Sequence, residues 1–305
     1  MTALQALANR HPRLLAALRD ALPAPLSALA RRSLGPVRIP VPPDAWVPLD
    51  SIPRPAGGAP ILPERTSVIV PVFNCREHVR LCLASLRACC SPCPEVIVVD
   101  DGSTDGTWPL LQAEAKSWPE LAVLRLVETR GFAHAVNHGA AEASGEVLIF
   151  LNSDVVVTPG ALGRIARAVH EDPGIGLASA ATNDSGDEAT VPAAYRTLDD
   201  LLGFAAQRAR AHADAVRDIP KAALFCAAIR RHVFLEVGGL DEGYGRGMFE
   251  DDDLARCLAR LGYRVCLVPG SFVHHYAGAS FRTLPPAAYL EIFERSRLRF
   301  ERKWG

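Results

Sequence analysis

Residues 95–107 read EVIVVDDGSTDGT, a β-branched apolar run that ends in two acids and a turn rich in Gly, Ser, Thr and Asp. The stretch from Val96 to Val99 predicts a buried parallel strand, because a strand covered by helices on both faces is apolar throughout. Asp100 and Asp101 then fall at its carboxyl end, the edge where open α/β sheets bind ligands. Acids at this edge can accept hydrogen bonds from a nucleobase or a ribose.

Strands and helices alternate on both sides of this segment. Apolar runs predict further strands at 67–72, 122–127, 146–151 and 175–180. Between them, apolar residues recur at helical spacing and predict helices at about 79–90, at 107–118, from 132 onward and at 162–169. This order predicts an α/β fold with a Rossmann-like, doubly wound and mostly parallel sheet.

Composition excludes several classes of protein. The 305 residues carry a formal net charge of -1, with 49% hydrophobic and 22% charged residues, so no overall field attracts nucleic acid. The eight cysteines are scattered, which favours a reducing compartment, and Cys90-Ser-Pro-Cys93 is interpreted as a loop rather than a metal site. No apolar run has the length of a membrane span, and the N-terminus lacks the pattern of a signal peptide. We therefore expect a cytoplasmic protein.

The two ends of the chain have a different character. Residues 1–63 combine a Leu/Ala/Arg-rich helical stretch with a proline-dense segment. We expect a helix that caps the domain or an ill-ordered extension, with contact with a membrane surface or a partner as the alternative. Residues 283–305 form a predicted basic amphipathic helix, with Tyr289, Ile292, Phe293, Ser296 and Phe300 on one side. This helix is expected to pack on the domain. Peripheral contact with the inner face of the plasma membrane is the alternative.

A second polar site follows the apolar segment VLIFL, residues 147–151. Asn152 and Asp154, separated by Ser153, share one face of an extended chain at this strand end. A carboxylate placed there can bind a hard divalent cation that also holds phosphate oxygens. Although such a triplet is common in turns, its position after the fourth predicted strand favours a cation site.

Four consecutive acids, residues 250–253, open a predicted helix. Acids are favourable at a helix start because they face the positive end of the helix dipole, so capping is the simplest interpretation. Four of them exceed that need, and five glycines lie between residues 238 and 247. A flexible approach of this kind suits a base that meets a substrate entering a cleft.

Two further polar segments, residues 274–275 and 182–184, belong to or follow segments that are expected to be extended. His274 and His275 stand side by side, and a neutral imidazole can complete a metal site. Adjacent side chains point in opposite directions in an extended segment, so one of the two can serve, with a surface pair as the alternative. Residues 182–184, Thr-Asn-Asp, are expected either to line the cleft or to form a capped turn.

Six segments together resemble the successive motifs of family 2 glycosyltransferases, of the bacterial surface-polysaccharide, rhamnosyltransferase-like kind. They keep the order and spacing of the family from about residue 65 to 282, and they are SVIVPVFN (67–74), VIVVDDGSTDGT (96–107), RGFAHAVNHG (130–139), LNSDVVVTPG (151–160), VGGLDEGYGRGMFEDDDLARCLARLGYRV (237–265) and VHHYAGAS (273–280). The resemblance implies a GT-A fold with an acceptor-side α+β extension. The GT-A domain would span 64–282, with a nucleotide-sugar half at about 64–180 and an acceptor and catalytic half at about 181–282.

The resemblance also implies which residues bind the nucleotide. It assigns Pro71, Val72, Asn74, Asp100 and Asp101 to the nucleotide pocket, where backbone groups and one carboxylate recognise base and ribose.

Arg130 would meet the diphosphate with its guanidinium, although relatives often have Asn there and a surface position is equally consistent. The donor would be a UDP-, dTDP- or GDP-linked sugar.

The metal and catalytic residues follow from the same comparison of motifs. Asn152, Ser153 and Asp154 stand at the family's DxD position, and since the first Asp is Asn here, Mg²⁺ or Mn²⁺ would rest on Asp154. His275 stands five residues before Ser280, as the family's metal-proximal His does, with His274 as the close alternative.

Asp251 would be the general base, and Glu250 would shape the pocket. The implied activity is inverting transfer of a sugar to a hydroxyl of a glycan or lipid-linked acceptor. A non-catalytic nucleotide-sugar-binding protein and a nucleotidyltransferase are the alternatives, with the sugar, the base and the oligomeric state left open.

Overall fold

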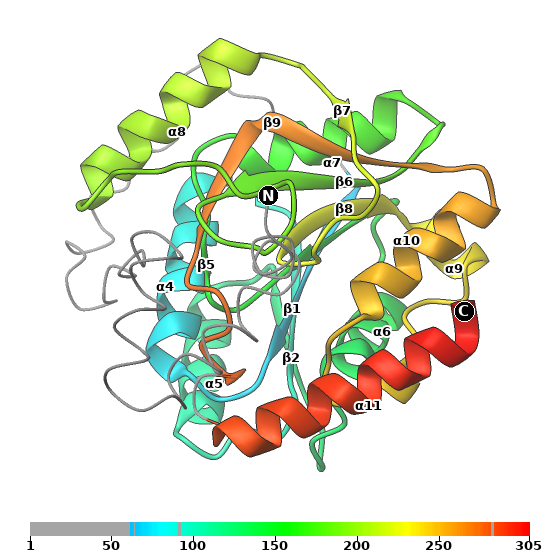
Figure 1. Ribbon diagram of the computed structural model, residues 1–305. Coiled ribbons are helices and arrows are strands. Elements are labelled where there is room, and N and C mark those ends of the chain that lie inside the picture. Colours follow the sequence, from blue (N-terminus) through cyan, green and yellow to red (C-terminus); the bar gives the residue numbers. More distant parts are fainter. Residues whose placement is uncertain (1–61, 64, 91–92, 282–283) are drawn as a thin grey trace, which may run out of the picture.

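The computed structural model describes residues 62–63, 65–90, 93–281 and 284–305 (Figure 1). The predicted N-terminal extension therefore lies outside the described residues, apart from Leu62 and Pro63. The described chain forms a central sheet with helices packed against it.

The nucleotide side of the sheet agrees with the pattern of apolar runs. The strands are β1 (Thr66–Val72), β2 (Glu95–Asp100), β3 (Leu121–Arg125) and β4 (Val147–Leu151). They pair in parallel in the order β3-β2-β1-β4. Every residue of β1 and β4 is buried, as expected for strands with both faces covered. The doubly wound arrangement is confirmed.

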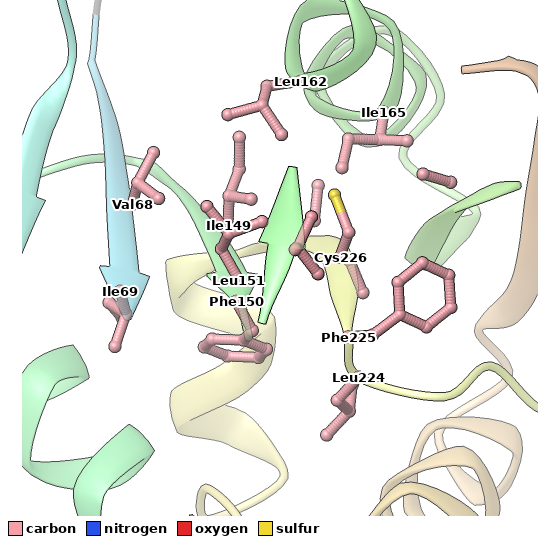
Figure 2. Packing of buried hydrophobic residues seen from close by; sticks show 14 of the residues in the cluster. Val68, Ile69, Ile149, Phe150, Leu151, Leu162, Ile165, Leu224, Phe225 and Cys226 are labelled. Carbon is pink, nitrogen blue, oxygen red and sulfur yellow. The ribbon is translucent and has the colours of Figure 1, made fainter. Parts of the chain in front are cut away.

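The helices on this side also match their apolar spacing. They are α4 (Arg76–Cys89), α5 (Thr107–Ser117), α6 (Phe132–Glu142) and α7 (Ala161–Glu171). Helix α6 packs on β1 and β2, and α7 packs on β4, β6, β8 and β9. Figure 2 shows Leu162 and Ile165 of α7 above the side chains of Ile149 and Cys226. Part of the core therefore lies between α7 and the middle of the sheet, and the same buried cluster includes residues of α4 and α6 such as Leu83 and Val136.

The second half of the chain extends the same sheet. It contributes β6 (Ile175–Thr182), β8 (Cys226–Arg230) and β9 (Arg264–His275), and the full order is β3-β2-β1-β4-β8-β6-β9-β5. Strand β8 is antiparallel to both β4 and β6, whereas β6 and β9 are parallel. Two short strands, β5 (Val155–Val156) and β7 (Arg217–Asp218), pair with β9. The sequence pattern did not predict the antiparallel insertion of β8.

The remaining helices surround this half. They are α8 (Leu198–His212), α9 (Arg231–Glu236), the 3₁₀ turn η3 (Glu242–Tyr244), α10 (Glu250–Arg260) and α11 (Pro286–Trp304). Helix α8, which the sequence pattern did not predict, begins with a capping box and packs on β9.

The C-terminal helix α11 packs on the domain, as predicted. It is drawn in red in Figure 1. The predicted stripe is buried at Tyr289, Ile292, Phe293 and Ser296. Within the described part of the chain, each helix is too short or too polar to cross a membrane.

Candidate active site

A cleft of about 280 Å³ opens at the carboxyl ends of β1 and β4. Its sheet-side wall consists of residues 71–73 and 152–154, as the strand-end pattern predicted. Residues within 185–187, 221–225 and 246–252 contribute further to its lining. The fold thus brings together nine of the predicted residues, namely Pro71, Val72, Asp101, Asn152, Ser153, Asp154, Glu250, Asp251 and His275.

The two acids after β2 occupy different environments. Asp100 is completely buried, its Oδ1 accepts from the Ser103 N–H at 3.0 Å, and its Oδ2 lies 3.6 Å from Arg125 Nε. Asp101 lines the cleft and accepts from the backbone N–H groups of Arg130 and Gly131 at 2.7 and 2.9 Å. Burial raises the pKa of Asp101, and these two hydrogen bonds oppose the rise.

Two other predicted nucleotide-binding residues lie outside the cleft lining. Asn74 has a positive φ of 56°, and its Oδ1 accepts from the Thr104 N–H at 2.8 Å, so it connects the end of β1 to the turn after β2. The side chain of Arg130 is exposed and is not among the cleft-lining groups. Its backbone N–H, rather than its guanidinium, contributes to the site by holding Asp101.

Asp154 and His275 face each other at the bottom of the cleft. The Oδ2 atom of Asp154 accepts from the N–H groups of Gly278 and Ala279 at 2.9 and 3.0 Å. The Oδ1 atom lies 3.1 Å from His275 Nε2. His275 Nδ1 lies 2.8 Å from the Asp184 carbonyl oxygen, which can only accept, so Nδ1 carries the proton. In the neutral imidazole, the lone pair of Nε2 is therefore directed to the carboxylate.

The backbone around His275 is held by an unexpected residue. The Asn183 side chain accepts from the His275 N–H at 2.8 Å and donates to the His275 carbonyl at 3.0 Å. The ring of Phe225 stacks on the imidazole with centroids 5.1 Å apart. Asn183 therefore positions a site residue instead of lining the cleft or capping a turn. A short Asn-Asp signal after β6 was visible in the sequence, but its partner 92 residues away was not.

His274 points away from this site, as the alternation of an extended chain requires. Its Nδ1 lies 2.7 Å from the Tyr195 hydroxyl, and its ring contacts Tyr276 edge-on with centroids 4.5 Å apart. Burial lowers the pKa of His274 to about 3, so the ring is neutral at physiological pH. The geometry thus selects His275 as the histidine beside Asp154.

Asp154 and His275 fit a divalent cation. Two ligands bound cis to one Mg²⁺ at about 2.1 Å are roughly 3 Å apart, which is close to the observed 3.1 Å between Asp154 Oδ1 and His275 Nε2. When the imidazole is neutral, two acceptors face each other in a buried place, which a cation between them would stabilise. The described residues contain no group of three or more His, Cys, Asp or Glu side chains suited to a metal. Substrate phosphates and water would complete the shell, as is usual for Mg²⁺.

The four acids at the start of α10 have separate surroundings, and Glu250 lines the cleft. Asp251 faces the cleft, and burial, followed by the charge of Asp252, raises its pKa to about 6. Asp252 accepts from Lys221 Nζ at 2.8 Å. Asp253 is buried on the other side, where Lys303 Nζ and Trp304 Nε1 donate to it at 2.8 and 2.7 Å.

Neither Lys221 nor Trp304 was predicted, since nothing in the local sequence pairs either one with the acids. The acids at the start of α10 therefore do more than cap the N-terminus of their own helix.

Helix α11 holds the loop that precedes these acids. Ser296 Oγ donates to the Gly247 carbonyl at 3.0 Å, and Phe293 and Phe300 contact the ring of Phe249. Phe249 has a positive φ of 72°, a conformation that needs support from its surroundings. The contacts with α11 provide this support.

Most basic residues of α11 make ion pairs within the protein. Arg299 pairs with Asp241 at 2.6 Å, and Arg297 pairs with Glu294 and Glu301. Lys303 pairs with Asp241 and Asp253. The basic composition that suggested membrane contact is therefore used mainly to dock and stabilise the helix.

Comparison with known proteins shows that the chain is similar to glycosyltransferases. The family model described as Glycosyl transferase family 2 matches residues 67–238, more than half of the chain. N-acetylglucosaminyl-diphospho-decaprenol L-rhamnosyltransferase of Mycobacterium tuberculosis is 28% identical over 256 residues, which are 75% of this chain and 81% of the relative. The uncharacterized glycosyltransferase YfnE of Bacillus subtilis is 36% identical over 109 residues, but the match spans only 35% of this chain and 27% of YfnE.

Solved structures share the fold at low sequence identity. GalNAc-T7 with UDP, GalNAc and Mn²⁺ has a TM-score of 0.58 and 20% identity, covering 77% of this chain and 48% of the other. The mannosyltransferase PcManGT from Pyrobaculum calidifontis, in complex with GDP-Man and Mn²⁺, has a TM-score of 0.53 and 22% identity over 90% of this chain and 68% of the other. The predicted GT-A fold is confirmed.

Proposed function

The chain belongs to glycosyl transferase family 2, and on that premise we propose that it transfers a sugar from a nucleotide-diphosphate sugar to an acceptor hydroxyl, with metal assistance and inversion. The observation that carries this proposal is the pairing of two kinds of group in one cleft. Asp154 and His275 offer a cation site, and Asp251 offers a carboxylate whose pKa is raised to about 6. The cation site would stabilise the leaving diphosphate, and the carboxylate would accept the proton of the attacking hydroxyl.

Asp251 acts as the general base in this proposal. A carboxylate whose pKa is about 6 is ionised at neutral pH and is a stronger base than an ordinary Asp. It takes the proton of the acceptor hydroxyl while that oxygen attacks the anomeric carbon opposite the leaving diphosphate. A single displacement of this kind inverts the anomeric centre.

The residues on the sheet side bind the donor. Asp101 is held by two backbone N–H groups in a fixed orientation at the end of β2, where it accepts hydrogen bonds from the nucleoside. Asp154 and His275 would hold Mg²⁺ or Mn²⁺, which supplies positive charge for the departing nucleotide diphosphate. Asn152 places an uncharged amide where a second carboxylate would stand, so the protein contributes less negative charge to the cation.

The acceptor is proposed to be a glycan or a lipid-linked glycan. The mycobacterial relative, matched along 81% of its length, carries a name that specifies a diphospho-decaprenol-linked acceptor. The lining of the cleft is partly aromatic, with Phe132, Phe249 and Phe281 among its residues. Aromatic faces of this kind suit the apolar faces of sugar rings.

The test uses the purified protein with a panel of UDP-, dTDP- and GDP-sugars in Mn²⁺, Mg²⁺ or EDTA, with release of nucleotide diphosphate as the measurement. We expect one donor class to be turned over, with activity lost in EDTA. Asp251→Asn should bind donor normally and lose transfer. The matched control is Asp199→Asn, which makes the same change at an exposed first-turn acid of α8.

The outcomes separate the alternatives. Near-normal turnover by Asp251→Asn would contradict the base assignment. Donor binding without turnover of any donor, with glycan and lipid-linked acceptors present, would indicate a binding protein. Release of pyrophosphate from a nucleoside triphosphate and a sugar phosphate would indicate a nucleotidyltransferase.

A further inference from the structure

Lys221 lies in the segment that leads into β8 and lines the cleft. Its Nζ donates to Asp252 Oδ2 at 2.8 Å. The backbone on either side is anchored, because the Ile219 N–H donates to the Val265 carbonyl at 2.9 Å and the Ala223 N–H donates to Asp187 Oδ2 at 2.8 Å. The ammonium group is therefore held in place rather than carried on a mobile loop.

Asp251 and Asp252 are neighbours at the start of α10, and both are half-buried at the cleft. Two carboxylates so close together oppose each other's ionisation, so one of them needs a compensating charge. Lys221 supplies that charge through its direct contact with Asp252. Asp251 Oδ1 accepts the Asp252 N–H at 2.9 Å, which fixes its orientation without using a cation.

We propose that Lys221 is a positioning residue for the general base: it binds Asp252 away from the substrate and leaves Asp251 as the ionised carboxylate that meets the acceptor hydroxyl. This inference rests on the function proposed above and adds a residue that the motifs do not identify. The two acids titrate as a coupled pair, in which Asp252 accepts the ammonium of Lys221 and Asp251 performs the proton transfer.

The charges around the pair support this division. Burial works against the charge of Lys221, but Asp251 and Asp252 outweigh burial and raise its pKa, so the ammonium persists. Asp187 also adds to this effect. The charge of Asp252 raises the pKa of Asp251, and the charge of Lys221 lowers it.

The other charged or titratable groups that line the cleft come from several elements: Glu250 from α10, Arg246 from the preceding loop, Tyr289 from α11, and Cys75, Asp101, Asp154 and His275 from the sheet side.

The test is the pH dependence of kcat/KM for four proteins: the wild type, Lys221→Met, Asp252→Asn and the double variant. The acidic limb reports ionisation of the base in the free enzyme. In Lys221→Met it should move up by about one pH unit. Such a shift lowers the rate about fivefold at pH 6 and hardly at all at pH 8. In Asp252→Asn the limb should move down, and in the double variant it should return close to the wild type.

Two further variants make the result specific. Lys221→Arg keeps the charge and should keep the limb in place. Lys116→Met removes an exposed lysine at the end of α5 and should leave the limb unmoved. If Lys221→Met lowers the rate equally at every pH, Lys221 contacts substrate or supports the fold, and the proposal is overturned.

A double variant that is worse than either single variant would also overturn the proposal. Failure of the proposed function would instead appear as full activity in Asp251→Asn, whatever Lys221 does.

Discussion

Replacement of Gly131 by Ala tests how closely the loop before α10 approaches the start of α6. Gly131 precedes α6 with φ 99° and ψ 174°, a backbone conformation that is essentially restricted to glycine. A Cβ atom there would lie 1.8 Å from the Gly245 carbonyl oxygen and 2.9 Å from the Arg246 nitrogen. The loop before α10 therefore passes directly over this glycine.

The expected magnitude has two parts. The backbone conformation alone should cost about 1–3 kcal/mol in the free energy of unfolding. The contact requires more, because a Cβ closer than 3.0 Å to another atom forces a shift, and here the Gly245 backbone must move by more than about 1 Å. A displacement of about 1 Å at groups that support catalysis can lower the rate roughly 100-fold. We therefore expect Gly131→Ala to lose about two orders of magnitude in transfer.

Urea unfolding and sugar transfer are measured on the same preparations, with Gly238→Ala as the control. Gly238 also has a positive φ, 85°, but a Cβ there meets nothing within 4 Å. The control should lose stability while keeping most of its activity. Activity in Gly131→Ala equal to that of Gly238→Ala would refute the close approach of Gly131 and Gly245.

Three more results are expected. The rate should rise with pH through a midpoint near pH 6 and level off above about pH 7 as Asp251 ionises. Stability should behave oppositely, because a carboxyl group whose pKa is raised in the folded state loses its stabilising contribution as pH rises through that folded pKa. Asp251→Asn should therefore unfold in urea at pH 8 no more easily than the wild type. Asn183→Ala should weaken Mn²⁺ activation about 10–100-fold in a metal titration, because it releases both backbone groups of His275. Trp304→Phe should lower the free energy of unfolding by about 1–3 kcal/mol in urea, because it removes a donor from buried Asp253.

The sequence alone determined the strands on the nucleotide side and the positions of the acids at their ends. Val96 to Val99 and residues 147–151 are apolar throughout because both faces of each strand are covered, and such a local signal can be read without the fold. The alternation of an extended chain likewise predicted that His274 and His275 face opposite ways.

The tertiary structure decided which of these groups meet. His275 faces Asp154 because β5 pairs with the end of β9, and this pairing joins residues about 120 positions apart. Asp252 accepts a hydrogen bond from Lys221, and Asp253 accepts one from Lys303 of α11. Asp251 therefore remains the Asp of this run that faces the cleft without an ion pair to either residue. Contacts between distant segments leave no period in the sequence, so local patterns place the candidate acids on the chain but only the packed fold gives each one its partner.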